Sequence, residues 1–397
     1  MRILMIAPQP FFTPRGTPLS VLHRLNTLSN LGHKIDLVTY HIGQTIPFEN
    51  VTYHRILKVP FIKRIQVGPS KRKIIVDFFV LLKSLKLLFK NDYDVIHTHE
   101  EAGFFGVWLA KWFKTIHLYD MHSSLPQQLT NFKFTKLGFL IKAFGSLENM
   151  TIQKSEAVIT ICPELFNYVD EKWPEKKQEL IENVADNSLV FGEPDVTSKE
   201  IREKYDLDSK QIILYAGTFE PYQGLDLLID ASRDIVKKTD QALFVLVGGN
   251  PDQVEKYRAM AEMYGLSKYF RFTGQVTPDW VPKFVETADI LVTPRIEGNN
   301  TPLKIYSYLR SGKPIVATNH MTHTQVLNSD VAMLTECTPE SFSQGLLKVM
   351  QDQKLQQKIS QNAQKLADEK YSYEVYVKKL SRIYAYLESQ LESGEKN

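Results

Sequence analysis

The sequence contains little cysteine. Cys162 and Cys337 are the only two among 397 residues, and they lie far apart in no metal-ligand spacing. This scarcity excludes a disulfide framework and a cysteine-based zinc site. A hydrophobic content of 43% with 23% charged residues is typical of a globular protein. Because the chain is too long for one compact core, we expect two domains. The scarcity of cysteine fits a reducing compartment.

Long apolar runs are also missing. The start, MRILMIAPQPFF, is broken by Pro8 and Pro10 before it could form the core of a signal peptide, and it predicts a buried first strand. Asp77, Lys83 and Lys86 interrupt the most apolar later region, so no window reaches the roughly 18 residues that a spanning helix needs. These absences predict a cytoplasmic protein that does not cross a membrane.

Charge is unevenly distributed along the chain. Residues 1–150 carry 19 lysines and arginines against 9 acidic residues, and the remainder carries 29 against 36. The net charge of +3 therefore combines +10 at the front with −7 behind. A basic domain attracts phosphate groups in a nucleic acid, a lipid headgroup layer or a phosphorylated substrate.

Apolar strand-like runs alternate with helical periodicities, and the pattern restarts near residue 210 with IILYAG, GLDLLIDASRDIVKK and ALFVLVGG. Such alternation implies mostly parallel sheets. We expect an α/β fold of two Rossmann-like, doubly wound domains facing across a cleft. The domains are predicted over 1–185 and 211–371, joined by a polar linker over 186–210. A helix over 372–397 is expected to pack back on the first domain.

Local signals mark the first helix and the candidate sites. Thr17 is a plausible N-cap, with Pro18 at the first helical position and Gly32 just past the end. Ligands of open parallel sheets bind beyond the carboxyl ends of the strands. Candidate chemistry is therefore expected after Ala7, Thr98, Asp120, Ala216, Gly248, Pro294 and Asn319.

The segment PRIEGNNTPLKIYSYLRSGKPIVAT, residues 294–318, is the most informative in the chain. It predicts a strand, an acidic loop, and a helix with Thr301 as cap and Pro302 at the first position. The free amides of such a helix start bind phosphate, and Lys304 in the first turn would add a cation. A capped surface helix with a solvated Lys304 is the alternative.

Metal ligands are scarce at the predicted strand ends. The Asp-x-Asp pairs, Asp92 with Asp94 and Asp206 with Asp208, lie before a strand and in the linker. We therefore expect no metal. In DVIHTHEE, residues 94–101, the two histidines alternate with other residues, and we expect one on each side of the sheet. We expect neither histidine to have further metal ligands beside it.

Several motifs together resemble those of family 4 retaining glycosyltransferases of the GT-B fold. They include the first strand, loop and helix, then DVIHTHE, YDMHSS, ENVAD, YAGTFEPYQGLDLLIDA, LVGGN, RFTGQV and SGKPIVAT, with an aromatic C-terminal segment. The resemblance implies a sugar transferred from a nucleotide-diphosphate donor without a metal, with a same-face attack.

The resemblance also implies particular site residues. His122 matches a histidine near the reacting carbon of the sugar, although a satisfied core histidine is the alternative. Glu297 or Asn299 matches the first of two motif glutamates, and Ser307 occupies the place of the second. The implied donor-binding residues are Arg15, Gly16, Gly217, Thr218, Gln223, Asn299, Asn300, Thr301, Pro302, Leu303, Lys304 and Ser307.

The expected phosphate grip departs from the family pattern. Thr218 and Gln223 stand where the family usually has an arginine and a lysine. With these two cations missing, helix-start amides, Lys304, Arg295 or Arg15 would have to stabilise the diphosphate. The family commonly has two adjacent glycines in the first loop, whereas this chain has Gly16 alone, which an ordinary turn would also explain.

Two basic and aromatic stretches, residues 63–90 and 131–145, suit an anionic membrane surface. In the first, Lys83, Lys86 and Lys90 recur at helical spacing opposite apolar residues, namely Phe79, Leu81, Leu85 and Leu88. An ordinary amphipathic helix packed on the sheet is the alternative. Nucleic-acid binding accounts for the charge less well, because no nucleic-acid module is recognised.

The sequence therefore predicts a retaining, metal-independent glycosyltransferase that uses a UDP- or GDP-sugar. The acceptor is expected to be a lipid, lipid-linked or polysaccharide hydroxyl at the inner face of a membrane. A nucleotide-sugar epimerase of the same fold and a catalytically silent sugar-binding subunit remain alternatives.

Overall fold

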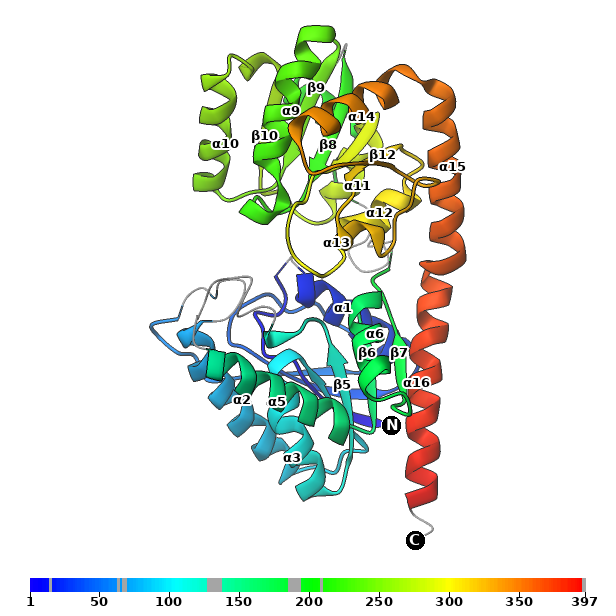
Figure 1. The fold of residues 1–397 in the computed structure, drawn as a ribbon. Helices are drawn as coiled ribbons and strands as arrows, with labels where there is room; N and C mark the ends of the chain where they lie inside the picture. Colours follow the sequence, from blue (N-terminus) through cyan, green and yellow to red (C-terminus); the bar gives the residue numbers. More distant parts are fainter. Residues whose placement is uncertain are drawn as a thin grey trace. The chain divides into compact units, whose positions relative to one another are not determined.

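The computed structural model describes residues 1–13, 16–62, 65, 70–126, 138–184, 194–207 and 210–394 (Figure 1). The chain forms two compact units. The first comprises Met1–Glu182 with Tyr376–Asn397, and the second comprises Asn183–Val375.

The first unit contains a parallel sheet in the order β3-β2-β1-β4-β5-β6-β7. Its strands are β1 (Arg2–Ile6), β2 (Lys34–Thr39), β3 (Val51–Arg55), β4 (Val95–His99), β5 (Ile116–Met121), β6 (Ala157–Thr160) and β7 (Gln178–Leu180). Every residue of β4 and β6 is buried, as expected for strands covered on both faces. The central strands pair in register, with Ile3 of β1 opposite Ile35 on one side and Val95 on the other.

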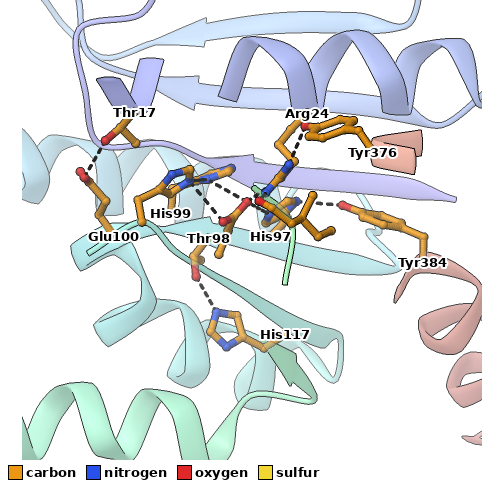
Figure 2. Close-up of polar contacts among 12 residues, drawn as sticks. Thr17, Arg24, His97, Thr98, His99, Glu100, His117, Tyr376 and Tyr384 are labelled. Carbon is orange, nitrogen blue, oxygen red and sulfur yellow. Dashed lines mark hydrogen bonds and ion pairs between the residues drawn. The ribbon is translucent and has the colours of Figure 1, made fainter. Parts of the chain in front are cut away.

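Helices cover both faces of this first sheet. They are α1 (Gly16–Asn30), α2 (Lys71–Leu88), α3 (Gly103–Phe113), α5 (Gly138–Lys154), α6 (Pro163–Lys172) and α16 (Tyr373–Gly394). On one face, α2 and α3 pack against Leu4, Ile6 and Ile96. On the other, α1 and α16 carry the polar side chains that reach the ends of β4 and β5 (Figure 2).

The second unit repeats the design with the sheet order β10-β9-β8-β11-β12-β13. Its strands are β8 (Gln211–Ala216), β9 (Ala242–Val247), β10 (Phe270–Gly274), β11 (Ile290–Thr293), β12 (Ile315–Thr318) and β13 (Met333–Thr335). Its helices are α8 (Ser198–Tyr205), α9 (Leu225–Lys238), α10 (Pro251–Met263), α11 (Trp280–Thr287), α12 (Lys304–Arg310), α13 (Met321–Thr324), α14 (Pro339–Gln351) and α15 (Gln353–Lys370). Apolar clusters fill the space on both faces of the sheet. The prediction of two doubly wound units is confirmed.

Two local predictions differ from the structure. Part of the predicted linker is helix α8, which a capping box between Thr197 and Glu200 starts and whose Ile201 is buried in the second core. Only Ile201 and the partly buried Tyr205 of this helix pack on the core, and two contacts give too short a periodicity for sequence reasoning to detect. Helix α1 begins at Gly16, so Thr17 lies within the helix, and its hydroxyl donates to Glu100 Oε1 at 3.0 Å.

Candidate active site

Polar side chains gather where β4 and β5 end in the first unit (Figure 2). Asp120, the last but one residue of β5, is fully buried, and His122 follows the strand with 3% of its surface exposed. His122 Nε2 lies 2.9 Å from His99 Nδ1 and 3.3 Å from Asp120 Oδ1. The structure therefore places the predicted site residue His122 within a polar network.

The expectation that His97 and His99 lie on opposite faces of the sheet was wrong. Their rings stack with centroids 4.5 Å apart. Side chains two positions apart in a strand point to the same face, so the alternation with apolar residues puts both imidazoles beside Asp120.

The charges in this network balance. Arg24 Nε donates to Asp120 Oδ2 at 2.9 Å, and both side chains are buried. Burial disfavours the charged carboxylate, yet the nearby Arg24 guanidinium and His122 hold the pKa of Asp120 well below its ordinary value. Burial lowers the pKa values of His97, His99 and His122, so these imidazoles are neutral at pH 7. One positive and one negative charge are left.

This charge balance bears on metal binding. His97, His99 and Asp120 offer ligand atoms close enough together to hold an ion, which the sequence analysis did not foresee. A divalent cation on Asp120 would lie beside the guanidinium of Arg24, which already occupies the carboxylate. The residue set therefore fits a hydrogen-bonded network better than a metal centre.

Glu100 stands at the edge of the network. It follows β4 directly and has φ +50°, a left-handed conformation that is uncommon for a residue with a side chain. Its carboxylate accepts the hydrogen bond from Thr17. Strained residues at strand ends often belong to functional sites, so Glu100 joins the candidate residues.

The loop after His122 is anchored by a buried carboxylate. Glu148 of α5 accepts hydrogen bonds from the Ser124 hydroxyl and the Leu125 amide, each at 2.9 Å. Burial raises the pKa of Glu148 to about 7. These two bonds hold the chain immediately beyond His122.

In the second unit, the side chain of Lys304 lies beside the loop that follows β8. Its Nζ is 3.6 Å from the centroid of the Tyr215 ring and 3.4 Å from Gln223 Oε1. A Cβ at Gly217 would lie 2.6 Å from Lys304 Nζ, and the φ of +156° at Gly217 is one that residues with side chains rarely adopt. Burial and the charge of Arg295 lower the pKa of Lys304 well below its ordinary value.

Arg295 is the second cation of this region. Its Nε donates to the Glu297 carbonyl at 2.8 Å, and its guanidinium lies 5.0 Å from the centroid of the Tyr222 ring. Within the described part of the chain, neither Arg295 nor Lys304 forms an ion pair with a carboxylate. Two cations therefore lie near each other without a protein anion.

The predicted helix start was placed too early. Helix α12 spans only Lys304–Arg310, and Leu303 precedes it without a side-chain cap. Thr301 is buried outside the helix, and the Pro302 carbonyl accepts from the Ile305 amide in a tighter turn. Lys304 itself, rather than a run of capped helix amides, is the marked feature of this segment.

The remaining predicted donor residues lie around the same loops. The Thr218 hydroxyl is 3.4 Å from Gln223 Nε2, and Glu297 is exposed while Asn299 and Asn300 are partly buried. Ser307 donates its hydroxyl hydrogen to the Lys304 carbonyl at 3.0 Å. A backbone group of its own helix thus uses the serine proton.

The other loop named by the sequence lies in the first unit. Gly16 begins α1 with open space where a Cβ would stand, so the structure does not require glycine there by crowding. Arg15 lies outside the described residues.

Sequence reasoning missed Arg24, Tyr376 and Tyr384. Arg24 falls within the apolar stripe of α1, between Val21 and Leu28, and a charge within such a stripe is a usable signal. The two tyrosines come from α16, more than 200 residues beyond β5, and no local pattern could have linked them to it.

Solved structures similar to this chain include a glycosyltransferase from Rickettsia africae ESF-5, with a TM-score of 0.70 at 17% identity, covering 97% of this chain and 98% of that one. The structure of Anabaena Alr3699/HepE in complex with UDP matches with a TM-score of 0.74 at 15% identity, covering 98% of this chain and 100% of that one. Among known families, Glycosyltransferase Family 4 matches residues 14–189 and Glycosyl transferases group 1 matches residues 197–366. The chain belongs to the family 4, group 1 type of glycosyltransferase, as the motifs predicted.

Sequence relatives agree with this assignment. A putative glycosyltransferase of Bacillus subtilis (strain 168), YtcC, is 28% identical over 198 residues, which cover 47% of this chain and 48% of that protein. The phosphatidyl-myo-inositol mannosyltransferase of Mycobacterium leprae (strain TN) is 22% identical over 404 residues, covering 100% of this chain and 99% of that protein.

Proposed function

We propose that this glycosyltransferase transfers a sugar from a UDP- or GDP-sugar to an acceptor hydroxyl with retention of anomeric configuration and without a metal. The carrying observation is the pair of cations, Lys304 and Arg295, that have no carboxylate partner among the described residues. A buried cation without a counter-ion is costly unless a ligand supplies the anion. A nucleotide diphosphate has the required charge.

The chemistry follows from where charge develops. Departure of the nucleoside diphosphate from the anomeric carbon places negative charge on its phosphate oxygens, and fixed cations stabilise that charge. Lys304 and Arg295 serve this purpose, with Thr218 and Gln223 as neutral hydrogen-bonding groups. In the retaining mechanism of this proposal, the leaving phosphate accepts the acceptor's proton on the same face of the sugar.

The other site residues take supporting roles in the proposal. Glu297, an exposed carboxylate, or Asn299 orients the sugar hydroxyls, and His122 contacts the sugar. The second unit holds the donor and the first unit binds the acceptor. The diphosphate is bound by Lys304 and Arg295 in place of the family's usual cations.

Calorimetric titration with UDP and GDP tests the donor site. Lys304→Met, which keeps the length of the side chain, is expected to weaken binding at least tenfold, about 1.4 kcal/mol. Turnover, measured as nucleotide release from a sugar nucleotide, should fall at least tenfold in Lys304→Ala. Lys256→Met is the matched control, because Lys256 is exposed and paired with Asp226 in the same unit.

The titration also separates the alternatives. Because burial and the charge of Arg295 lower the pKa of Lys304 in the free protein, binding of an anion beside it is expected to raise that pKa. Unchanged affinity in Lys304→Met would remove Lys304 from the donor site. Absence of binding to either nucleotide would favour a silent subunit, and epimerised sugar released without transfer would favour an epimerase.

The acceptor side of the proposal rests on the surface of α2. Phe79, Leu81 and Leu85, which the sequence placed on a membrane face, pack against the first core instead. A different set of side chains is exposed on α2 and just after it, comprising Arg72, Ile74, Ile75, Phe78, Leu82, Lys86, Phe89 and Lys90. The acidic residue of the helix, Asp77, is not exposed and accepts a hydrogen bond from Tyr40.

This apolar and basic surface suits a lipid or lipid-linked acceptor at an anionic membrane. The second stretch named by the sequence is described only from residue 138, and it exposes Phe139. None of the described helices combines the length and apolarity that crossing a bilayer requires. The contact in this proposal is therefore peripheral.

Flotation with vesicles of phosphatidylglycerol and phosphatidylcholine tests the membrane contact. The protein is expected to float at low salt and less at high salt, because screening weakens the attraction of the basic residues. Replacing Phe78 and Leu82 by serine should reduce the floated fraction severalfold. Met263→Ser, at an exposed apolar residue of the second unit, is the control. No binding of the unaltered protein at low salt would contradict the proposal.

A further inference from the structure

The network around Asp120 draws its members from four separate parts of the first unit (Figure 2). Arg24 comes from α1, His97 from β4, Asp120 from β5, and Tyr376 and Tyr384 from the C-terminal helix α16. All five side chains are buried. A buried polar group costs free energy unless it is hydrogen-bonded, so the direction of each bond in such a network is constrained.

The direction of each bond follows from the charged pair. Asp120 is ionised and therefore accepts only. Arg24 Nε donates to Asp120 Oδ2 at 2.9 Å, and Arg24 Nη2 donates to the carbonyl of Ile181 at 3.1 Å. His97 Nε2 lies 3.4 Å from Asp120 Oδ2, and His122 Nε2 lies 3.3 Å from Asp120 Oδ1. Neither pair has hydrogen-bond geometry, since His97 Nε2 and Asp120 Oδ1 have no hydrogen-bond partner within the described part of the chain. The negative carboxylate nevertheless favours a proton over a lone pair on the nitrogen that faces it, so the neutral imidazoles of His97 and His122 are assigned a proton on Nε2.

The tyrosines of α16 complete this pattern. His97 Nδ1, left with a lone pair, accepts from the Tyr384 hydroxyl at 2.8 Å. Arg24 Nη1 donates to the Tyr376 hydroxyl at 2.5 Å. Tyr376 thereby orients the guanidinium that holds Asp120, and Tyr384 fixes the tautomer of the histidine that shares this carboxylate.

His99 extends the pattern to the strand end. Its Nδ1 lies 2.9 Å from His122 Nε2, close enough to share the proton that points toward Asp120. With the proton on Nε2 of His122, His99 Nδ1 accepts the hydrogen bond, and the negative charge of Asp120 Oδ1 lies 3.3 Å from the same nitrogen. The same tautomer thus suits both the carboxylate and the neighbouring imidazole.

We propose that Asp120, oriented by Arg24 and by Tyr376 and Tyr384 of α16, is a positioning residue that fixes His122 in its Nε2-protonated tautomer. The catalytic part of this inference rests on the proposed function, in which His122 contacts the donor sugar. In the other tautomer, the imidazole nitrogen of His122 that faces the sugar would donate a hydrogen bond where the sugar needs an acceptor, or accept one where the sugar needs a hydrogen-bond donor. Docking of the C-terminal helix is therefore a condition for turnover and does more than close the fold.

The main test is a pair of measurements on the full-length protein with Asp120→Asn. Long-range nitrogen–proton correlation spectra of histidine-labelled protein report which imidazole nitrogen carries the proton. An asparagine at this position would turn its amide NH₂ toward one of the histidines, and we expect His122 to move to the Nδ1-protonated tautomer. Nucleotide release from UDP-glucose or GDP-mannose should fall about 100-fold, less than the drop of about 10⁴ in the wrong-tautomer variant of the serine-protease triad, because His122 contacts the sugar and is not the general base. Nucleotide affinity should change less than threefold.

A gentler variant keeps the test decisive if Asp120→Asn does not fold. Tyr384→Phe removes only the hydroxyl that bonds to His97, and it should shift the His97 nitrogen resonances and lower kcat about three- to tenfold without raising KM for the donor. Tyr386→Phe is the matched control, because this neighbouring tyrosine of the same helix bonds to Glu156 outside the network. The control is expected to leave the histidine nitrogen resonances unshifted and kcat within twofold of the unaltered protein.

The outcomes separate this inference from the proposed function. If the tautomer of His122 is unchanged in Asp120→Asn, the positioning network is overturned whatever the activity. If Asp120→Asn does not fold, unchanged His97 nitrogen resonances in Tyr384→Phe overturn it. If the tautomer moves while turnover stays within twofold, the network exists but its catalytic role is overturned. Loss of nucleotide binding in Lys304→Met bears on the donor site alone, because Lys304 belongs to the second unit.

Discussion

The two units share a topology but differ in how they treat charge. The strand order β3-β2-β1-β4-β5-β6 of the first sheet has the same connectivity as β10-β9-β8-β11-β12-β13 of the second. In the first unit, Arg24 and Asp120 neutralise each other inside a network of neutral histidines. In the second, Lys304 and Arg295 lie near each other without a described carboxylate partner. The charges of the first network are paired, and in our proposal an anionic ligand supplies the missing charge in the second unit.

Each unit also contains a buried histidine that forms hydrogen bonds with side-chain hydroxyl groups. His117 of β5 lies 2.8 Å from the Thr98 hydroxyl and 2.9 Å from that of Ser155. His323 of α13 lies 2.9 Å from the hydroxyl of Thr293, which belongs to β11, the strand equivalent to β4. Burial lowers the pKa of each of these histidines to about 3. The difference between the units therefore concerns whether buried charges are paired, not polar groups in general.

The largest expected effect comes from breaking the charge pair of the first unit. Arg24→Met leaves the buried Asp120 carboxylate without its cation, which is expected to destabilise the first unit by about 3–5 kcal/mol. Hydrogen exchange of peptides from β4 and β5, compared with β8 and β9, would localise the loss. Arg233→Met, at an exposed arginine of α9, is the control, and a loss below about 1 kcal/mol for Arg24→Met would contradict the prediction.

Each unit is expected to lose stability in acid because of its own buried histidine, so replacing one histidine should make the acid dependence of the two units differ. A histidine whose folded pKa of about 3 lies below its ordinary 6.5 stabilises the fold above pH 6.5, and this stability is lost as the pH falls toward 3. At pH 5, each histidine is expected to cost about 2 kcal/mol relative to pH 7. His117→Gln should flatten the acid dependence of the first unit alone, and His323→Gln that of the second. Identical pH profiles for both variants and the unaltered protein would show that these histidines are not the acid-sensitive groups.

The smallest of the three expected effects is stabilisation of the second unit, but not the first, by a bound anion. Pyrophosphate at ten times its dissociation constant is expected to stabilise the second unit by about 1.4 kcal/mol and leave the first unchanged. Hydrogen exchange of the segments after β8 and β11 would show the protection, and Arg295→Met should abolish it. Equal protection of β4 and β5 would mean that the first unit also binds the anion.

Much of the fold was predictable from local patterns. Apolar strand runs such as RILMI and IILYA, with helices between them, led to two parallel sheets because both faces of each strand are buried. Helix boundaries were less predictable. The start of α12 was misplaced because a Thr-Pro pair is a good cap by composition, whereas the turn before Lys304 closes more tightly.

The candidate site was predictable in part. His122 and Lys304 follow strand ends and carry recognisable chemistry, so the sequence named them. Asp120 stood as a strand end without a role, and His97 and His99 were separated although their spacing puts them on one face. Their significance depends on Arg24 and on α16, which approach from distant parts of the chain.

By itself, the amino-acid sequence determined the doubly wound architecture, the glycosyltransferase family and the scarcity of cations at the expected phosphate positions. These properties depend on local periodicity, short motifs and residue identity. Only the tertiary structure decided that three histidines share one carboxylate, that two tyrosines of the last helix join them, and that Lys304 lies over Tyr215 without a described acidic partner. Burial and pairing set these charges and tautomers, and both depend on which distant segments the fold brings into contact.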